Sequence, residues 1–245
     1  MEILGIDIGG SGLKAALVEV ATGELTSDRV RVPTPKPATP AAVIESLVEL
    51  VDQLAWDGPI GCGYPGVVRN GVVQTAANLD AAWIGIDLCK ALAHETACPV
   101  TVMNDADAAG LAEVRFGAGR GRRGVILMLT FGTGIGSALF VDGRLVPNTE
   151  LGHVEIGGKT AETRAADRVR EEKQLTWKKW AERVDEVLAR LALYVAPDLV
   201  IVGGGVSKKH EKFLPFIQSR APIVPAKLRN EAGIVGAAVL ASETK

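Results

Sequence analysis

The chain has 245 residues, of which 47% are hydrophobic, and a formal net charge of −2. This length allows two domains or one large one, and the small net charge gives no general signal for binding to nucleic acid or to a membrane. The sequence shows no signal-peptide pattern, no apolar run long enough for a membrane span and no C-x-x-C pair. We therefore expect a reduced, cytoplasmic protein with three scattered cysteines, Cys62, Cys89 and Cys98.

Strands and helices are expected to alternate along the chain. Residues 3–33 favour a meander of three strands, followed by a proline-rich connector at 34–40. The next elements are a helix at 41–55, a strand at 58–68, a helix at 87–97, a strand at 99–105, an alanine-rich helix at 106–119, a hairpin at 125–143, helices at 160–173 and 176–196, a strand that enters a triple glycine at 198–207 and a helix at 233–242. This order predicts an α/β protein with ligands at the carboxyl ends of its strands.

The segment "DIGGSGLK", residues 7–14, is the first of two glycine-rich loops. Its pattern Gly10-x-Gly12-x-x-Ala15 matches the dinucleotide-binding fingerprint. That fingerprint requires a helix after the glycines, whereas the apolar run here ends at the turn signal Gly23. The run is too short for such a helix, so we expect a second strand and a β-hairpin.

The segment "TFGTGIGSALFVDG", residues 130–143, has the same layout. Each loop follows an apolar strand and contains a hydroxyl residue among its glycines, Ser11 in the first and Thr133 in the second. Glycines let the backbone approach an anion closely, and consecutive N–H groups form a concave anion site. The repeated layout predicts a duplicated hairpin that clamps one polyanion from both sides.

Three further motifs are candidates for chemistry. "NDAD", residues 104–107, is typical of a helix N-cap, but beside two phosphate loops an aspartate at a strand end also suits a general base. "ELGHVEI" places Glu150, His153 and Glu155 close together, and Asp7 precedes the first loop, where it could hold Mg²⁺ through water. "GGGV", residues 203–206, favours either a ligand at a helix N-terminus or a tight turn.

Taken together, the motifs resemble those of the ROK-family sugar kinases, which belong to the actin-like ATPase (ribonuclease H-like) superfold. The matching segments occur in the family's order over nearly the whole chain: "DIGGSGLK", "GYPGVV", "ANLDAAWIGIDL", "NDADAAGLAE", "LTFGTGIGSALFVDG", "ELGHVEI" and "DLVIVGGGVS". The resemblance implies a duplicated α/β fold in which two domains close around a cleft over the sugar. We expect a smaller domain of residues 1–104 with 229–245 and a larger one of residues 105–228.

The resemblance also implies roles for individual residues. Asp105 is expected to be the catalytic base, and Mg²⁺ to be held by Asp7 through water. The expected sugar-binding residues are Asn78, Asn104, Asp105, Glu150, His153 and Glu162. The expected donor phosphate-binding residues are Asp7, Gly9, Gly10, Ser11, Gly12, Lys14, Thr130, Gly132, Thr133, Gly134, Gly204, Gly205, Lys208 and Lys209.

The chain departs from the family pattern after His153. Most members carry a cysteine cluster there that binds structural zinc together with the histidine, whereas residues 154–170 contain no cysteine. Tetrahedral zinc needs four good ligands, so we expect no zinc site. The shortened segment resembles the polyphosphate-dependent glucokinases, which implies a homodimer that phosphorylates the 6-hydroxyl of glucose with polyphosphate or ATP as the donor and with Mg²⁺.

Other functions remain open at this point. An ATP-dependent hexokinase of the family without zinc is the main alternative. A DNA-binding regulator is disfavoured because no helix-turn-helix or basic segment precedes the first hairpin, and a non-catalytic sugar sensor because Asp105 and both glycine loops are present. A polyphosphate donor needs a run of cations, for which the candidates are Arg120, Arg122, Arg123, Lys208, Lys209 and Lys212; solvated surface loops are the alternative interpretation.

Overall fold

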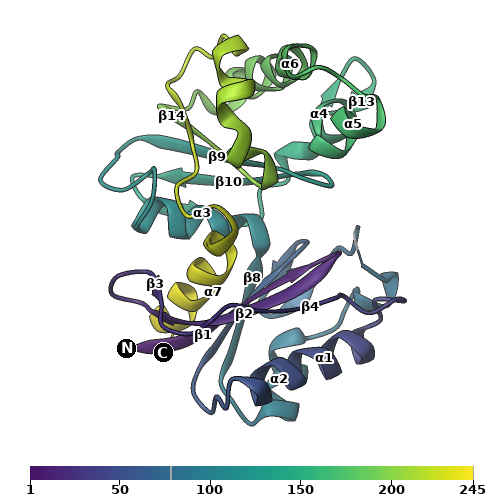
Figure 1. Ribbon diagram of the computed structural model, residues 1–245, viewed down its shortest axis with the longest axis vertical. Coiled ribbons are helices and arrows are strands. Elements are labelled where there is room, and N and C mark those ends of the chain that lie inside the picture. Colours follow the sequence, from purple (N-terminus) through teal and green to yellow (C-terminus); the bar gives the residue numbers. More distant parts are fainter. Residues whose placement is uncertain (78, 245) are drawn as a thin grey trace. The chain divides into compact units, whose positions relative to one another are not determined.

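The computed structural model describes residues 1–77 and 79–244. The chain forms two compact units, one of residues 1–112 together with the segment from Glu231 onward, and one of Glu113–Asn230 (Figure 1). The boundaries expected from the sequence, after residues 104 and 228, differ from those of the units. The first unit extends further because the start of helix α3 (Asp105–Arg115) packs on helix α7 (Ala232–Glu243), where Gly236 meets the carbonyl of Ala108. The assignment of these units as domains stays a prediction.

The sheet of unit 1 has the strand order β3-β2-β1-β5-β8. Its central strand β1 (Glu2–Gly9) is antiparallel to β2 (Gly12–Glu19) and parallel to β5 (Ile60–Tyr64), and β5 is parallel to β8 (Val100–Asn104). The third strand of the predicted meander is two short strands, β3 (Glu24–Leu25) and β4 (Val30–Val32), and both pair with β2.

The sheet of unit 2 repeats this plan with the order β11-β10-β9-β14-β15. Its central strand β9 (Val125–Phe131) is antiparallel to β10 (Ile135–Val141) and parallel to β14 (Leu199–Gly203), which is parallel to β15 (Ile223–Pro225). The edge strand β11 (Arg144–Val146) pairs with β10. Two units with one strand plan confirm the expected duplicated α/β fold.

Helices cover both faces of the sheet of unit 1 (Figure 1). On one face, α1 (Pro40–Gln53) and α2 (Leu88–Thr96) pack their leucines and valines against Leu4, Ile6 and Ile8 of β1. On the other face, α7 lies directly on the strands. A side chain at Gly5 would overlap the carbonyl oxygen of Ile234, and one at Gly61 that of Ala237. These two glycines are what allows α7 to approach so closely.

The helices expected at 41–55, 87–97, 106–119, 176–196 and 233–242 are confirmed as α1, α2, α3, α6 (Trp177–Val195) and α7. One expectation was wrong. The helix at 160–173 is broken into α4 (Ala161–Ala165) and α5 (Asp167–Glu172), because Ala166 has extended backbone (φ −59°, ψ 153°) and the indole of Trp180 binds the carbonyl of Ala165 at 2.9 Å. The strand expected to enter the triple glycine is confirmed as β14, which ends at Gly203, and a kinked 3₁₀ segment η3 (Gly205–Lys212) follows it.

The remaining elements are short. They are β6 (Val68–Arg69), β7 (Val72–Val73), η1 (Ala81–Trp83), η2 (Leu151–His153), β12 (Glu155–Ile156), β13 (Lys159–Thr160), η4 (Leu214–Phe216) and η5 (Arg229–Glu231). Within the described residues, every helix is too short or too polar to cross a membrane.

Candidate functional site

The first glycine loop is the turn of the β1–β2 hairpin. Gly9 and Gly12 are cross-strand partners, and Gly10 and Ser11 form the exposed turn between them. Four of the expected donor-binding residues therefore form one hairpin tip, whose backbone is open to solvent at the turn. The hairpin prediction for this segment is confirmed.

Asp7 and Lys14 face each other across this hairpin. They are cross-strand partners, and Lys14 Nζ lies 2.6 Å from Asp7 Oδ2. The side chain of Asp7 is 17% exposed and that of Lys14 is 27% exposed. The carboxylate expected to hold Mg²⁺ and the ammonium expected to bind phosphate thus form an ion pair with each other.

Sequence reasoning missed Arg31. This residue lies on β4 as the cross-strand partner of Lys14, and its Nη2 donates a hydrogen bond to the carbonyl oxygen of Ser11 at 3.1 Å. The meander predicted for residues 3–33 includes this strand, but only the register of β4 on β2 shows that the strand brings a guanidinium to the glycine hairpin.

The second glycine loop, Gly132–Gly134, joins β9 to β10. Phe131 and Ile135 are cross-strand partners, and the backbone N–H of Gly132 donates to the carbonyl of Gly134 at 3.0 Å. Gly132 and Thr133 are exposed, while Thr130 is half-buried at the end of β9. Gly132 and Thr133 are therefore exposed at the turn of this hairpin, as Gly10 and Ser11 are in the first, and the N–H of Gly132 is bonded within the loop.

The triple glycine lies beside this second loop. Gly203 pairs with Thr130, and Gly204 has φ +79° and lies against the backbone of Phe131, where a side chain would overlap the carbonyl oxygen. The backbone bends at Gly204, and a 3₁₀ segment rather than an α-helix follows. The structure thus brings Gly204 and Gly205 together with Thr130, Gly132, Thr133 and Gly134.

The predicted cations of unit 2 are all exposed. Lys208 and Lys209 lie on η3 directly after the triple glycine, and Lys209 Nζ lies 5.8 Å from the ring centroid of Trp177. Lys212 ends the same segment, and Arg120, Arg122 and Arg123 precede β9. Of these residues, Lys208 and Lys209 are nearest in sequence to the glycines that contact β9.

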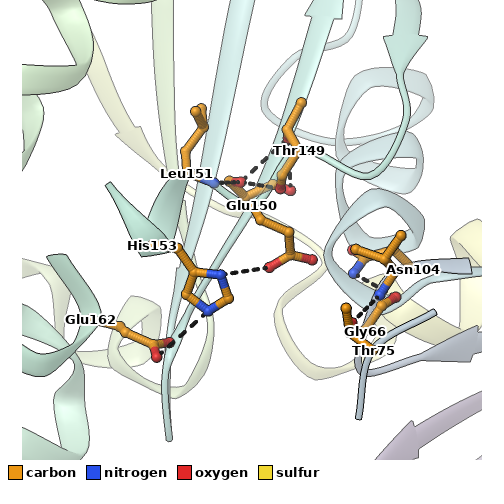
Figure 2. A network of polar contacts seen from close by, with 10 residues as sticks. Gly66, Thr75, Asn104, Thr149, Glu150, Leu151, His153 and Glu162 are labelled. Carbon is orange, nitrogen blue, oxygen red and sulfur yellow. Dashed lines mark hydrogen bonds and ion pairs between the residues drawn. The ribbon is translucent and has the colours of Figure 1, made fainter. Parts of the chain in front are cut away.

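The "NDAD" motif lies at the junction of β8 and α3. Asn104 Oδ1 accepts hydrogen bonds from the backbone N–H groups of Ala106 (2.9 Å) and Asp107 (3.0 Å), and Asn104 Nδ2 donates to the carbonyl of Gly66 at 3.1 Å (Figure 2). The capping interpretation therefore applies to Asn104. Asp105 is the first residue of α3 and is half-buried, and its Oδ1 accepts from the N–H of Ala106 at 2.7 Å.

His153 lies between two glutamates in unit 2 (Figure 2). Its Nδ1 is 4.0 Å from Glu150 Oε2, and its Nε2 is 3.7 Å from Glu162 Oε1. Glu162 also lies so close to Gly134 that a side chain there would come within 2.5 Å of its Oε2. Burial raises the pKa of Glu150, with Glu162 adding to the rise and His153 opposing it. These three expected sugar-binding residues form one cluster beside the second glycine loop.

The cluster is not arranged like a metal centre. The two carboxylates face opposite nitrogens of the His153 ring, so the three side chains do not converge on one point. Among the described residues, no group of three or more His, Cys, Asp or Glu side chains is placed to hold a metal ion. Asn78, the remaining expected sugar-binding residue, lies outside the described residues.

Comparisons with known proteins agree with this geometry. The model of the ROK family matches residues 3–166. The chain is 52% identical to a polyphosphate glucokinase of Mycobacterium tuberculosis (strain CDC 1551 / Oshkosh) over 236 residues, which cover 96% of this chain and 89% of that protein. The crystal structure of an inorganic polyphosphate/ATP-glucomannokinase from Arthrobacter sp. strain KM matches with a TM-score of 0.96 and 46% identity, covering 99% of this chain and 98% of that one. A glucokinase of the same family from Streptomyces griseus, in complex with glucose and AMPPNP, matches with a TM-score of 0.83 and 26% identity over the full length of both chains.

Proposed function

Because this chain belongs to the ROK family and has its two-unit actin-like fold, we propose that it transfers a phosphoryl group from inorganic polyphosphate, and also from ATP, to the 6-hydroxyl of glucose. The products are glucose 6-phosphate and the donor shortened by one phosphate. The observation that carries this proposal is the pair of glycine hairpins at equivalent positions of two sheets with one strand plan. The names of the most similar relatives support the choice of sugar and donor.

In the proposed mechanism Asp105 is the general base. Its carboxylate accepts the proton of the 6-hydroxyl while the hydroxyl oxygen forms a bond to the terminal phosphorus, and the bond from that phosphorus to the rest of the donor breaks. The hydrogen bond from the N–H of Ala106 to Asp105 Oδ1 supports this role, because it fixes one carboxylate oxygen.

Sugar binding is assigned to five side chains besides Asp105. Glu150, His153 and Glu162 hydrogen-bond sugar hydroxyls in this proposal, and the carboxylates act as acceptors. Asn104 already uses its oxygen for the helix cap and one amide hydrogen for Gly66. It therefore offers glucose only its second amide hydrogen. Asn78 completes the proposed set.

Donor phosphates are assigned to the two glycine hairpins, to Gly204 and Gly205, and to the cations Lys14, Lys208 and Lys209. Mg²⁺ is proposed as the companion of the donor, where it neutralises charge on the phosphates. Asp7 fits a water-mediated ligand, since Mg²⁺ in phosphoryl-transfer sites is held by one or two carboxylates together with substrate phosphates. Lys14 occupies only one oxygen of that carboxylate.

Three finer assignments complete the proposal. We propose that no structural zinc is present, since the chain lacks the cysteine cluster of its family. We propose a homodimer, and the neighbouring side chains of Leu193 (69% exposed) and Tyr194 (62% exposed) on α6 are candidates for its interface. A cytoplasmic location is supported by the three free cysteines.

The test is one coupled assay of glucose 6-phosphate formation, with long-chain polyphosphate and ATP as donors in parallel reactions. We expect both donors to support turnover, with Mg²⁺ required. If ATP supports turnover and polyphosphate does not, the enzyme is instead an ATP-dependent kinase of the same family. If neither donor phosphorylates glucose, the proposed function is wrong.

A further inference from the structure

The first glycine hairpin carries charged side chains on three adjacent strands. Asp7 on β1, Lys14 on β2 and Arg31 on β4 occupy one cross-strand row, since Asp7 pairs with Lys14 and Lys14 with Arg31. Directly opposed residues of neighbouring strands project from the same face of a sheet. The row therefore presents one carboxylate and two cations beside the Gly10–Ser11 turn.

The charges in this row do not balance. The ammonium of Lys14 is neutralised by Asp7 at 2.6 Å. Arg31 is exposed, and none of the carboxylates in the described part of the chain forms an ion pair with it. The net positive charge of the row therefore lies on the guanidinium of Arg31.

The position of this guanidinium depends on a missing side chain. A Cβ atom at Gly12 would lie 2.7–2.9 Å from Arg31 Nη2, Nε and Cζ, and these are the nearest heavy atoms that it would meet. Gly12 thus leaves the notch in which the guanidinium lies, and the carbonyl of Ser11 holds it there through Nη2 at 3.1 Å. Gly12 therefore leaves room for the side chain of Arg31 on β4 and also forms part of the hairpin.

We propose that Arg31 is a donor-binding residue that contacts a phosphate of the phosphoryl donor at the first glycine hairpin, an inference that rests on the proposed function. A guanidinium has five N–H donors in a planar fork that matches phosphate oxygens, and it stays charged at any physiological pH. One of these donors is used by Ser11, and the others remain for a ligand. Both polyphosphate and ATP present the same phosphate chemistry to it.

The test uses the full chain with three substitutions, Arg31→Gln, Arg31→Lys and, as a matched control, Arg29→Gln. Arg29 is exposed and lies two residues earlier, and no hydrogen bond or ion pair joins it to the described residues. We expect Arg31→Gln to raise the KM for polyphosphate and for ATP about tenfold, which corresponds to one charge-assisted hydrogen bond of about 1.4 kcal/mol. The donor KM of Arg31→Lys should lie between that of the unsubstituted chain and that of Arg31→Gln. The donor KM of Arg29→Gln should stay within about twofold of that of the unsubstituted chain.

A second readout separates binding from support of the hairpin. The KM for glucose and the Tm of Arg31→Gln should be unchanged, and its KM for polyphosphate should depend less on salt, because fewer phosphate contacts release fewer counterions. Gly12→Ala should raise the donor KM strongly in the unsubstituted chain, because the new Cβ displaces the guanidinium of Arg31. It should raise the donor KM less in the Arg31→Gln background, which has no guanidinium at this position.

The outcomes are distinguishable from failure of the proposed function. Calorimetric titration of inorganic tripolyphosphate into the protein without glucose should show about tenfold weaker binding for Arg31→Gln, whether or not the chain phosphorylates glucose. Equal donor KM and equal tripolyphosphate affinity in Arg31→Gln and Arg29→Gln would overturn the inference. So would a rise in the glucose KM together with a fall in Tm, since these would assign Arg31 a structural role only.

Discussion

Asn104 caps the helix in which Asp105 is the first residue. Its Oδ1 binds the N–H groups of Ala106 and Asp107, and its amide binds the carbonyl of Gly66. The side chain that the sequence suggests for sugar binding is thus also what fixes the backbone from which Asp105 projects. A substitution that tests Asp105 should therefore leave Asn104 unchanged, because Asn104 fixes the backbone at the start of α3.

Asp105→Asn should lower kcat by about 10²–10⁴-fold, because the amide keeps the shape of the side chain but cannot accept the proton. Glucose binding, measured by calorimetry or by fluorescence quenching, should be largely kept. Asp107→Asn is the comparison, since Asp107 is buried two residues further into α3. A loss of less than about tenfold in Asp105→Asn would transfer the role of base to another group.

Glu150→Gln should stabilise the fold at neutral pH. The folded-state pKa of Glu150 is raised, mainly by burial, so its ionised form is disfavoured in the native state. The contribution of Glu150 to the stability of the fold is fully present at a pH below 4.5, the ordinary pKa of the group. This contribution is lost as the pH rises through the raised pKa of the folded state. The variant should therefore have a higher Tm than the unsubstituted chain at pH 8, and the difference should shrink as the pH falls toward 4.5. Glu155→Gln, at an exposed position nearby, should show no such trend.

Gly204→Ala should destabilise unit 2, whereas Gly205→Ala should be tolerated. Gly204 has φ +79° and lies against the backbone of Phe131, while a Cβ at Gly205 would meet no atom within 4 Å. The combined left-handed strain and steric overlap should cost about 2–4 kcal/mol, measured as a shift in the urea midpoint followed by tryptophan fluorescence. Equal midpoints for the two variants would contradict this account of the turn.

Replacing Lys208 and Lys209 together with alanine should raise the KM for long polyphosphate more than the KM for ATP. A polyphosphate chain continues past the reacting phosphates, and these exposed cations follow the glycines that lie beside the second hairpin. Exposed charges are screened over about 8 Å at physiological ionic strength, so the KM for polyphosphate should also rise with salt while that for glucose barely responds. An equal change for both donors would show that the lysines belong to the shared phosphate site.

Elemental analysis of protein purified without a polyhistidine tag should find less than stoichiometric zinc. No cysteine follows Gly132, and His153 lies between two carboxylates that face opposite sides of its ring. A chelator that leaves Mg²⁺ available should not lower the Tm. Stoichiometric zinc would contradict the proposed absence of a metal site.

The sequence predicts this fold well where local pattern and tertiary structure agree. Both glycine hairpins and the long amphipathic helix α6 lie where the apolar spacing places them. It fails where a contact from elsewhere decides the backbone. The break at Ala166 depends on the indole of Trp180, which takes the carbonyl of Ala165. No periodicity within residues 160–173 could reveal that contact.

The candidate site shows the same limit. Asp7 and the hairpin glycines are found from one short segment, but Arg31 is separated from Ser11 by 20 positions and reaches it only through strand register. Asn104 carries a side chain that suits either a cap or a ligand. Only the geometry of Gly66, Ala106 and Asp107 around it shows how many of its hydrogen-bonding groups are already used.

The close seat of α7 on the glycines of β1 and β5 has a consequence for the order in which the protein assembles during synthesis. The strands that receive this helix leave the ribosome early, whereas α7 is translated only after all of unit 2. Until then, the face of the sheet around Gly5 and Gly61 lacks the helix that covers it. Unit 2 is contiguous in sequence and has its own core, and domains tend to fold as units as they emerge. We therefore expect unit 1 to complete its native packing after unit 2.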